Sequence, residues 1–446
     1  MKTIISCLFF VLLTGCASVL TQPESQEIYV ATNGYHGNGS FEHPYRTIQE
    51  AVDVAQAGDT IYIRGGSYHE KIIIKNSGKK NQPITLRNYQ QETVVIDGSQ
   101  QKTTKELDGL LIIKNQQYIT LDGLSFVNFS SDNENVPTGV LLTGTSHHII
   151  VNQCRISNIT TKNPNPEQAN AHALAVYGTD SVQAIHHIEI TNCEISQNIL
   201  GLSETVVLNG NVENFNIARN KIHDNDNIGI DMIGFEGTAS QNDFARDGFC
   251  EENELWNNST TNNPSYNEAS AASIYVDGGR NIVIQRNVIW ASDIGVEAAS
   301  EHQNKTTKQI VIRNNLIYDC LEIAGIAFGG YDEQKGSATE IKIYNNTLVN
   351  NAAHIFVQEH AQVTSNEIIN NIFYLGEAYE GDLTQIKHTP NFYQQPKFVD
   401  EKKHNFHLRK DSSARNTGII SQWVGDDDLD GNSRINDKKI NFGAYQ

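Results

Sequence analysis

Basic residues are scarce in this chain of 446 residues. It holds 33 Lys and Arg against 52 Asp and Glu, which gives a formal charge of −19 at pH 7. So acidic a chain repels nucleic-acid phosphates and offers no basic patch that would bind them. We therefore expect no nucleic-acid partner.

Cysteine and proline are also rare, with six and nine residues respectively. Four cysteines lie in the body of the chain, at Cys154, Cys193, Cys250 and Cys320, and none shows C-x-x-C spacing. The lack of that spacing argues against a cysteine zinc site. We expect buried core thiols, with a disulfide as the alternative outside the cytoplasm.

The N-terminus has a Lys2 start, an apolar run over 4–13 and then Leu-Thr-Gly-Cys16. This segment resembles a bacterial lipoprotein signal, and the alternative is a simple secretory signal. The resemblance implies a signal peptide over 1–15, lipidation at Cys16 and a tether over 16–27. Since Ala17 follows the cysteine, it also implies a protein anchored in the bacterial cell envelope, at the outer membrane.

One pattern, apolar-x-apolar-x-x-Asn/Cys-x-apolar, is abundant. The sixth position of its nine copies is Leu124, Cys154, Cys193, Asn220, Asn253, Asn287, Asn315, Asn346 and Asn371. The first copy has Leu there, and the copies at Asn253 and Asn371 lack the first apolar residue. Each copy predicts a short strand, a polar bend and the start of another strand. A single copy cannot bury its apolar edge, so the repeat predicts one elongated stack of strands.

A helix is expected before this stack. Residues 47–56 carry apolar side chains at a helical period, and Thr47 with Glu50 fits a capping box. Strands are expected at 60–64, 71–75, 84–87 and 94–97. The helix would close the open end of the stack, which would otherwise expose an apolar cross-section.

Two terminal segments suggest a family. Residues 29–68, with Pro44-Tyr-Arg-Thr-Ile-Gln-Glu-Ala-Val, resemble the entry cap of secreted right-handed parallel β-helix enzymes that act on carbohydrates, and 428–445 resembles the tail that many of them share. The resemblance implies an all-β, right-handed parallel β-helix with an N-terminal capping helix. We expect the cap and first rungs over 28–100, the core with active-site loops over 101–375, and final rungs and tail over 376–446. We expect a monomer.

An aromatic column follows the repeat. The residues directly after its last apolar position are Val127, Ser157, Ser196, His223, Trp256, Trp290, Tyr318, Val349 and Tyr374. Equivalent positions in stacked strands lie about 4.8 Å apart, so the four central rings predict a ladder. His223, Trp256 and Trp290 would line a sugar-binding groove, or the ladder is structural and lies beneath a long loop.

Acidic residues occur on the same rungs. If Ile230, Ile274 and Val296 point inward, Asp231, Tyr275 and Glu297 point outward on successive rungs. Asp277 is outward two residues after Tyr275. We expect these residues and the aromatic column to form one groove.

Two carboxylate pairs are candidates for catalysis. Asp231 and Glu297 would lie two rungs apart, roughly 9–10 Å, near the upper end of the separation that suits an inverting glycosidase. Asp224 and Asp231 could lie closer, as a retaining enzyme requires. The segment around them resembles β-helix hydrolases of the lacto-N-biosidase type. The resemblance implies that two aspartates seven residues apart act, with Asp224 as acid and Asp231 as nucleophile or base.

Loops are expected at 235–248 and 257–271, where such stacks place selectivity. Further polar residues expected at the cleft are Glu236, Arg246, Glu301 and His302.

Three functions remain open. The first is hydrolysis of a poly- or oligosaccharide, with no cofactor. The second is a lyase or epimerase with Ca²⁺ held by Asp224, Asp226 and Asp231 and a base from Lys221, Arg246 or Arg280. The third is glycan binding without catalysis. Because the carboxylates pair, the prediction is a glycoside hydrolase.

Overall fold

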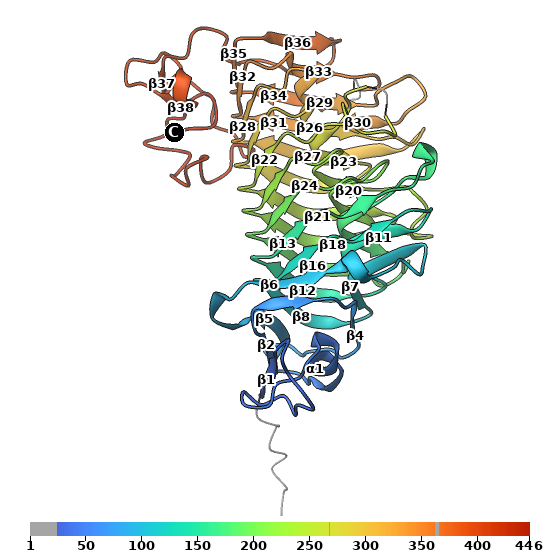
Figure 1. Cartoon of the computed structure of the whole chain (residues 1–446). Helices are drawn as coiled ribbons and strands as arrows, with labels where there is room; N and C mark the ends of the chain where they lie inside the picture. The colour runs from blue at the N-terminus through green and yellow to red at the C-terminus, as the bar shows by residue number, and fades with distance from the viewer. Residues whose placement is uncertain (1–24, 267, 362–364) are drawn as a thin grey trace, which may run out of the picture.

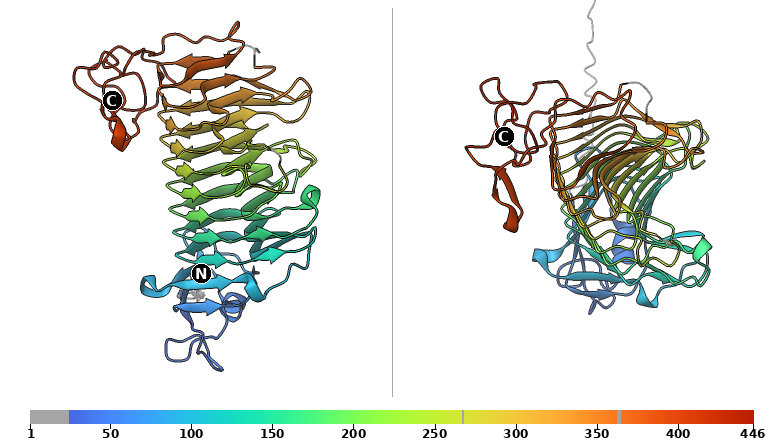
Figure 2. Two further views of the ribbon diagram at one scale, coloured as in Figure 1. Left: turned by 45° about the horizontal axis from the view of Figure 1, so that its top comes forward. Right: turned by 90° about the horizontal axis from the view of Figure 1, so that it is seen from above.

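The chain forms one long stack of parallel strands, described here by a computed structural model for residues 25–266, 268–361 and 365–446. Figure 1 shows the stack with helix α1 (Ile48–Val54) at one end and the C-terminal segment beside the other end. Seen from above in Figure 2, the rungs superimpose as a single column, and the C-terminal segment projects from one side.

The column has three faces, named A, B and C here. Face A consists of β1 (Glu27–Val30), β2 (Thr60–Ile63), β5 (Ile84–Asn88), β8 (Gln117–Asp122), β12 (His147–Asn152), β16 (Ile185–Thr191), the second half of β18 (Val206–Ala218), β21 (Phe244–Glu251), β24 (Arg280–Gln285), β27 (Thr306–Arg313), β30 (Ser337–Thr339), β31 (Lys342–Tyr344) and β34 (Glu367–Ile369).

Face B consists of the short strands after each bend: β3 (Gly66–Tyr68), β6 (Val94–Asp97), β9 (Ser125–Val127), β13 (Arg155–Ser157), β17 (Glu194–Ser196), β19 (Lys221–His223), β22 (Glu254–Trp256), β25 (Val288–Trp290), β28 (Leu316–Tyr318), β32 (Thr347–Val349) and β35 (Ile372–Tyr374).

Face C consists of β4 (Ile72–Ile74), β7 (Leu107–Lys114), β11 (Val136–Thr143), β15 (His172–Gly178), the first half of β18, β20 (Ile230–Ile233), β23 (Ala272–Asp277), β26 (Ile294–Ala299), β29 (Ala324–Gly329), β33 (Ala353–Val357) and β36 (Glu377–Gly381). Small elements outside the faces are β10 (Ser130–Ser131), β14 (Thr160–Thr161), β37 (Phe398–Asp400), β38 (Asn405–Leu408) and the 3₁₀ turns Tyr89–Gln91, Gly98–Gln100, Pro166–Gln168 and Glu401–Lys403.

Strand pairing along each face is parallel and nearly unbroken in register. The apolar residues of the repeat point into the column, and Ile282, Ile284 and Ile289 of one rung are fully buried. Each rung therefore buries its apolar edge against the next, and the predicted all-β parallel β-helix is confirmed.

The repeat's sixth position forms a ladder of asparagines at the bend between faces A and B. Nδ2 of each side chain donates to Oδ1 of the next, at 2.9–3.0 Å from Asn220 to Asn371, and Asn391 extends the ladder. The side chains satisfy backbone groups that the bend would leave unpaired inside the column. The four described cysteines are buried and free, which confirms the core-thiol interpretation.

Helix α1 closes the N-terminal end as expected. Thr47 accepts from the backbone N–H of Glu50, and Glu50 accepts from that of Thr47, so the capping box is present. Ile48, Ala51 and Val52 are buried against the first rungs. The expected strands of this region correspond to β2, β4, β5 and β6.

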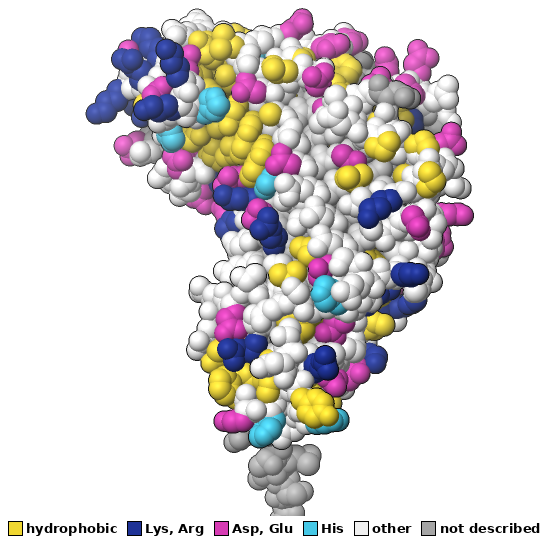
Figure 3. All heavy atoms as spheres, in the orientation of Figure 1, with side chains coloured by type: hydrophobic (Ala, Val, Ile, Leu, Met, Phe, Trp, Pro, Cys, Tyr) yellow, Lys and Arg dark blue, Asp and Glu magenta, His cyan; other side chains and the backbone are white. Residues whose placement is uncertain are grey.

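The C-terminal segment covers the last rungs of face B. Phe398, Phe406 and Phe442 form a buried cluster with Tyr318 and Val349, and Trp290 packs against it. Figure 3 shows hydrophobic side chains gathered beside this segment.

The expected lipoprotein signal and Cys16 lie outside the described residues and stay predictions. Among the described residues, no helix has both the length and the apolar character needed to cross a membrane.

Candidate active site

Three outward positions of face C stand in register on successive rungs. Asp231 of β20 pairs with Tyr275 of β23, and Tyr275 pairs with Glu297 of β26. This confirms the alternation expected from the sequence. On the next rungs the column continues as Ala327 and Phe356.

These outward side chains are nevertheless buried. Asp231 is 3%, Tyr275 4% and Glu297 6% exposed, because loops cover this part of face C. The loops enclose a cavity of about 580 Å³, whose lining includes Tyr266, Tyr275, Glu297, Glu301, Tyr331 and Gln358. Tyr266 comes from the loop between β22 and β23, as expected for a loop that shapes a binding site.

Five carboxyl groups lie close to one another here and are called the acid cluster: Glu204, Asp231, Asp277, Glu297 and Glu301. Of these, Glu297 and Glu301 line the cavity. Burial raises the pKa of each, to about 8 for Glu204 and about 7 for Glu297. The pKa of Asp231 rises well above its usual range through burial and then through the charges of Glu204 and Asp277. Since like charges this close cannot all ionise, the cluster retains protons at neutral pH.

Hydrogen bonds distinguish the members of the cluster. Gln358 Nε2 donates to Glu297 Oε1 at 2.6 Å, which favours the ionised form of Glu297. Asp231 Oδ1 is buried without a hydrogen-bond partner among the described residues. The bond from Gln358 therefore offsets part of the rise in the pKa of Glu297, whereas the pKa of Asp231 stays well above its usual range and the group keeps its proton.

A second chain of polar groups supports Glu204. His172 Nδ1 lies 3.0 Å from the backbone oxygen of Glu204 and 3.6 Å from its Oε2, and Tyr177 Oη lies 3.2 Å from His172 Nε2. Burial lowers the pKa of His172 to about 4, so the imidazole is neutral at neutral pH. The sequence did not predict a role for Glu204, because this residue lies in a bend, where strand alternation does not apply.

Asp277 of the acid cluster also forms a group with Glu236 and His302. Their ligand atoms all lie within 4.8 Å of one another, and His302 Nε2 is 2.8 Å from Glu236 Oε1. The backbone N–H of Glu301 donates to Asp277 Oδ1 at 2.8 Å. This group could hold a divalent cation.

Asp224 lies away from these residues, at the bend after β19. Its carboxylate accepts from Asn257 Nδ2 at 2.5 Å and contacts His223 Nδ1 at 2.7 Å. Burial would raise the pKa of Asp224, but these two contacts outweigh burial and lower it. Burial raises the pKa of Asp231 most, and the charged groups that raise it further are Glu204, Asp277, Glu301 and Glu297, without Asp224. The structure therefore places Asp231 and Glu297 on face C, two rungs apart, and Asp224 at the bend that follows a strand of face B.

The expected calcium ligands Asp224, Asp226 and Asp231 do not come together. Asp226 accepts from the backbone N–H of Leu200 at 2.7 Å, and burial raises its pKa to about 6. Within the described residues, the three do not form a group of carboxylates spaced to bind one ion.

The aromatic ladder is confirmed as a stack. Ring centroids are 3.9 Å apart for His223 and Trp256, 4.8 Å for Trp256 and Trp290, and 5.8 Å for Trp290 and Tyr318. The ladder lies on face B, however, whereas the acid cluster lies on face C. The expectation of one shared groove is wrong. The alternation of side chains along a strand predicts which of them point outward, but it does not predict to which face of the column the strand belongs. Tyr318 also contacts His404 and Phe406 of the C-terminal segment. These contacts agree with the alternative interpretation, in which the ladder is structural and is covered by another part of the chain.

Arg246 was expected in a long loop over 235–248, and this expectation is wrong. The loop ends where β21 begins at Phe244, and Arg246 lies on face A, where it pairs with Glu213 at 2.5 Å. The sequence Phe-Ala-Arg-Asp-Gly-Phe-Cys alternates only weakly, so strand pairing with β18 decides its structure.

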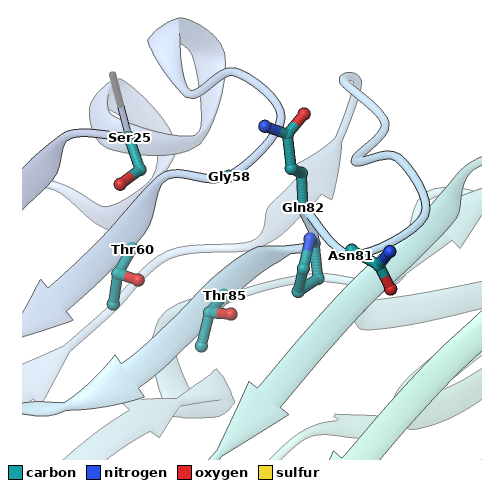
Figure 4. A pocket seen from close by; sticks show the side chains of 7 residues that line it. Ser25, Gly58, Thr60, Asn81, Gln82 and Thr85 are labelled. Atoms are coloured by element: carbon teal, nitrogen blue, oxygen red, sulfur yellow. The ribbon is translucent and has the colours of Figure 1, made fainter. Parts of the chain in front are cut away.

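A hollow of about 760 Å³ lies near the N-terminal end, beside β2 and β5. Figure 4 shows its lining, with Ser25, Thr60, Asn81 and Thr85 among the labelled residues. The described residues that line it include neither an ionisable nor an aromatic side chain, in contrast to those of the cavity on face C.

These features define a parallel β-helix with a carboxylate-rich cavity on one face. Residues 28–199 match the family described as Pel9A-like, right handed beta helix region, and residues 204–382 match the right handed beta helix region family. The column is therefore right-handed.

The chain belongs to the family of the protein YwoF from Bacillus subtilis. The two are 35% identical over 436 residues, which cover 87% of this chain and 92% of YwoF. A shorter match, 38% identical over 114 residues, is to pectate lyase PEL9 from Emericella nidulans, and it covers 23% of this chain and 28% of that enzyme.

Solved structures show the same fold. Pectate lyase Pel9A superposes with a TM-score of 0.55 at 12% identity, over 95% of this chain and 96% of that chain. A lacto-N-biosidase from Eubacterium ramulus superposes with a TM-score of 0.56 at 14% identity, over 82% and 67% of the two chains.

Proposed function

We propose that the protein is a carbohydrate-active enzyme that hydrolyses glycosidic bonds in the cavity on face C. The observation that carries this proposal is the in-register column of Asp231, Tyr275 and Glu297 beside that cavity. Two rungs separate the carboxyl groups by roughly 9.5 Å, which leaves room for a water molecule in an inverting reaction.

The two acids take different roles. Asp231, whose pKa is raised well above its usual range, donates a proton to the oxygen of the leaving sugar. Glu297, with a pKa of about 7 and a hydrogen bond from Gln358, accepts a proton from the attacking water. Tyr275 lies between them and lines the floor on which a sugar ring would rest. This assignment reverses the role that the lacto-N-biosidase resemblance implied for Asp231.

The substrate of this reaction would be a neutral poly- or oligosaccharide. The acid cluster repels uronates, whose carboxylates would add like charge to a site that already retains protons. Aromatic side chains of Tyr266 and Tyr331 line the cavity and offer apolar surface to sugar rings.

A cation-dependent lyase is the second candidate, and the Asp277, Glu236 and His302 group favours it because these residues could hold a divalent ion. Pectate lyases are also among the similar proteins. A lyase needs a base, and Lys335 lies 3.9 Å from Glu301. Burial would lower the pKa of Lys335, but Tyr331 and Glu301 outweigh burial and raise it, so the amine stays protonated. A protonated amine is a poor base.

Reaction products distinguish the two candidates. We expect incubation with a panel of neutral and uronic polysaccharides to release reducing ends from a neutral glycan, without the ultraviolet absorbance of an unsaturated sugar and without loss on adding a chelator. Unsaturated products that disappear with a chelator would show the lyase and refute the hydrolase.

A further inference from the structure

Four histidines form a compact array on face A, away from the cavity on face C. They are His147 and His148 on β12 and His186 and His187 on β16, and the register pairs His147 with His186 on adjacent rungs. Neither the acid cluster nor the proposed hydrolysis involves them.

Backbone conformation explains why consecutive residues share one side of the strand. His148 has φ of 53° and His187 has φ of 54°, which is the left-handed region. Such a residue interrupts the alternation of an extended strand, so both imidazoles of each pair lie together. The rungs on either side have the same conformation at Tyr118 and Asn214, so the bend belongs to the fold and the histidines are specific to two rungs.

The imidazoles are close enough to share one ligand. His147 stacks on His186 at 4.7 Å and His148 on His187 at 4.4 Å between ring centroids. The Nδ1 atoms are 2.8 Å apart in the first strand's pair and 2.7 Å apart in the second. Ligand nitrogens of His147, His148 and His186 all lie within 4.8 Å of one another.

The short contacts between ring nitrogens also bear on metal binding. A neutral imidazole keeps one lone pair, and an Nδ1 to Nδ1 contact requires that one of the two nitrogens be unprotonated. The array thus presents several unprotonated nitrogen atoms in one place.

We propose that this array binds a zinc ion through three imidazoles, with water as the fourth ligand. Imidazole nitrogens suit zinc and its transition-metal neighbours, whereas calcium and magnesium require oxygen ligands. Zinc bonds of about 2.0–2.1 Å in a tetrahedral site place two nitrogens about 3.3 Å apart. The present contacts reach that spacing by a small rotation of the rings. Glu213 on the next rung pairs with Arg246, so its charge is already balanced.

The test is zinc titration of tag-free protein, previously treated with chelator, by isothermal calorimetry. We expect saturable binding of one ion per chain, and Co²⁺ in place of zinc should give the visible absorption of a nitrogen-coordinated tetrahedral site. The double variant His148→Asn/His187→Asn should weaken binding at least tenfold. Asparagine occupies the same left-handed position at Asn214, so this variant should keep the fold, as circular dichroism would verify.

His36→Asn is the matched control, because His36 is exposed and also has a positive φ, of 49°. It should bind zinc as the unaltered protein does. Equal zinc affinity in the double variant and the unaltered protein, or the absence of saturable binding in the unaltered protein, would overturn the proposal. The single variant His148→Asn, which removes one of the three grouped imidazoles, is measured in parallel and decides the question if the double variant fails to fold.

Discussion

At the residue scale, the acid cluster couples protonation to stability. Glu204 has a pKa of about 8 in the folded protein, against an ordinary value of 4.5. Between these values the folded protein keeps a proton that the unfolded chain has lost, so this group's contribution to stability falls as the pH rises through that window. Burying these acids is therefore unfavourable for folding, which suits residues kept for chemistry.

Replacing Glu204 should weaken the dependence of stability on pH. We expect the free energy of unfolding of the unaltered protein to fall between pH 5 and pH 8, and we expect Glu204→Gln to reduce that fall by on the order of a few kcal/mol. Urea unfolding at both pH values measures this. The exposed Glu134→Gln serves as control and should keep the full dependence. A Glu204→Gln variant with an unchanged pH dependence would contradict the raised pKa.

At the element scale, the asparagine ladder fixes successive bends to one another. Asn287 donates to Cys250 O and to Asn315 Oδ1, and it accepts from the backbone N–H and the Nδ2 of Asn253, all at 3.0 Å. One side chain therefore satisfies buried groups on both neighbouring rungs.

Asn287→Ala should thus destabilise the fold by about 2–4 kcal/mol, since it leaves several buried polar groups without partners. Chemical denaturation measures the change. Asn262→Ala, at an exposed position, should stay within about 0.5 kcal/mol of the unaltered protein. Equal free energies of unfolding for the two variants would show that the hydrogen bonds of Asn287 do not stabilise the fold.

The sequence predicted the elements well and their placement around the column less well. The repeat predicted the asparagine column and the rings from His223 to Tyr318, because both depend on rung spacing alone. It did not predict that Asp231 and Trp256 occupy different faces, since the angle between successive strands depends on the bend. The sequence did not predict the positions of Glu204 and the histidine pairs. Side chains do not alternate between the inside and the outside of the column at a bend or at a residue with left-handed backbone conformation.

At the scale of the whole molecule, the two outward features have different surroundings. The C-terminal segment packs on face B over Trp290 and Tyr318, whereas loops on face C leave a cavity. The ladder thus stabilises the contact between the segment and the column, and the proposed active site lies on face C. The net charge of −19 is consistent with a substrate that carries no negative charge of its own.

The most direct measurement compares the turnover of three variants on the cleaved glycan: Asp231→Asn, Glu297→Gln and Asp224→Asn. We expect kcat to fall about 10²–10⁴-fold for the first two, with KM little changed, because they lose proton transfer and keep the cavity. Asp224→Asn should stay within tenfold of the unaltered enzyme. Loss of turnover in Asp224→Asn together with normal turnover in Glu297→Gln would contradict the assignment.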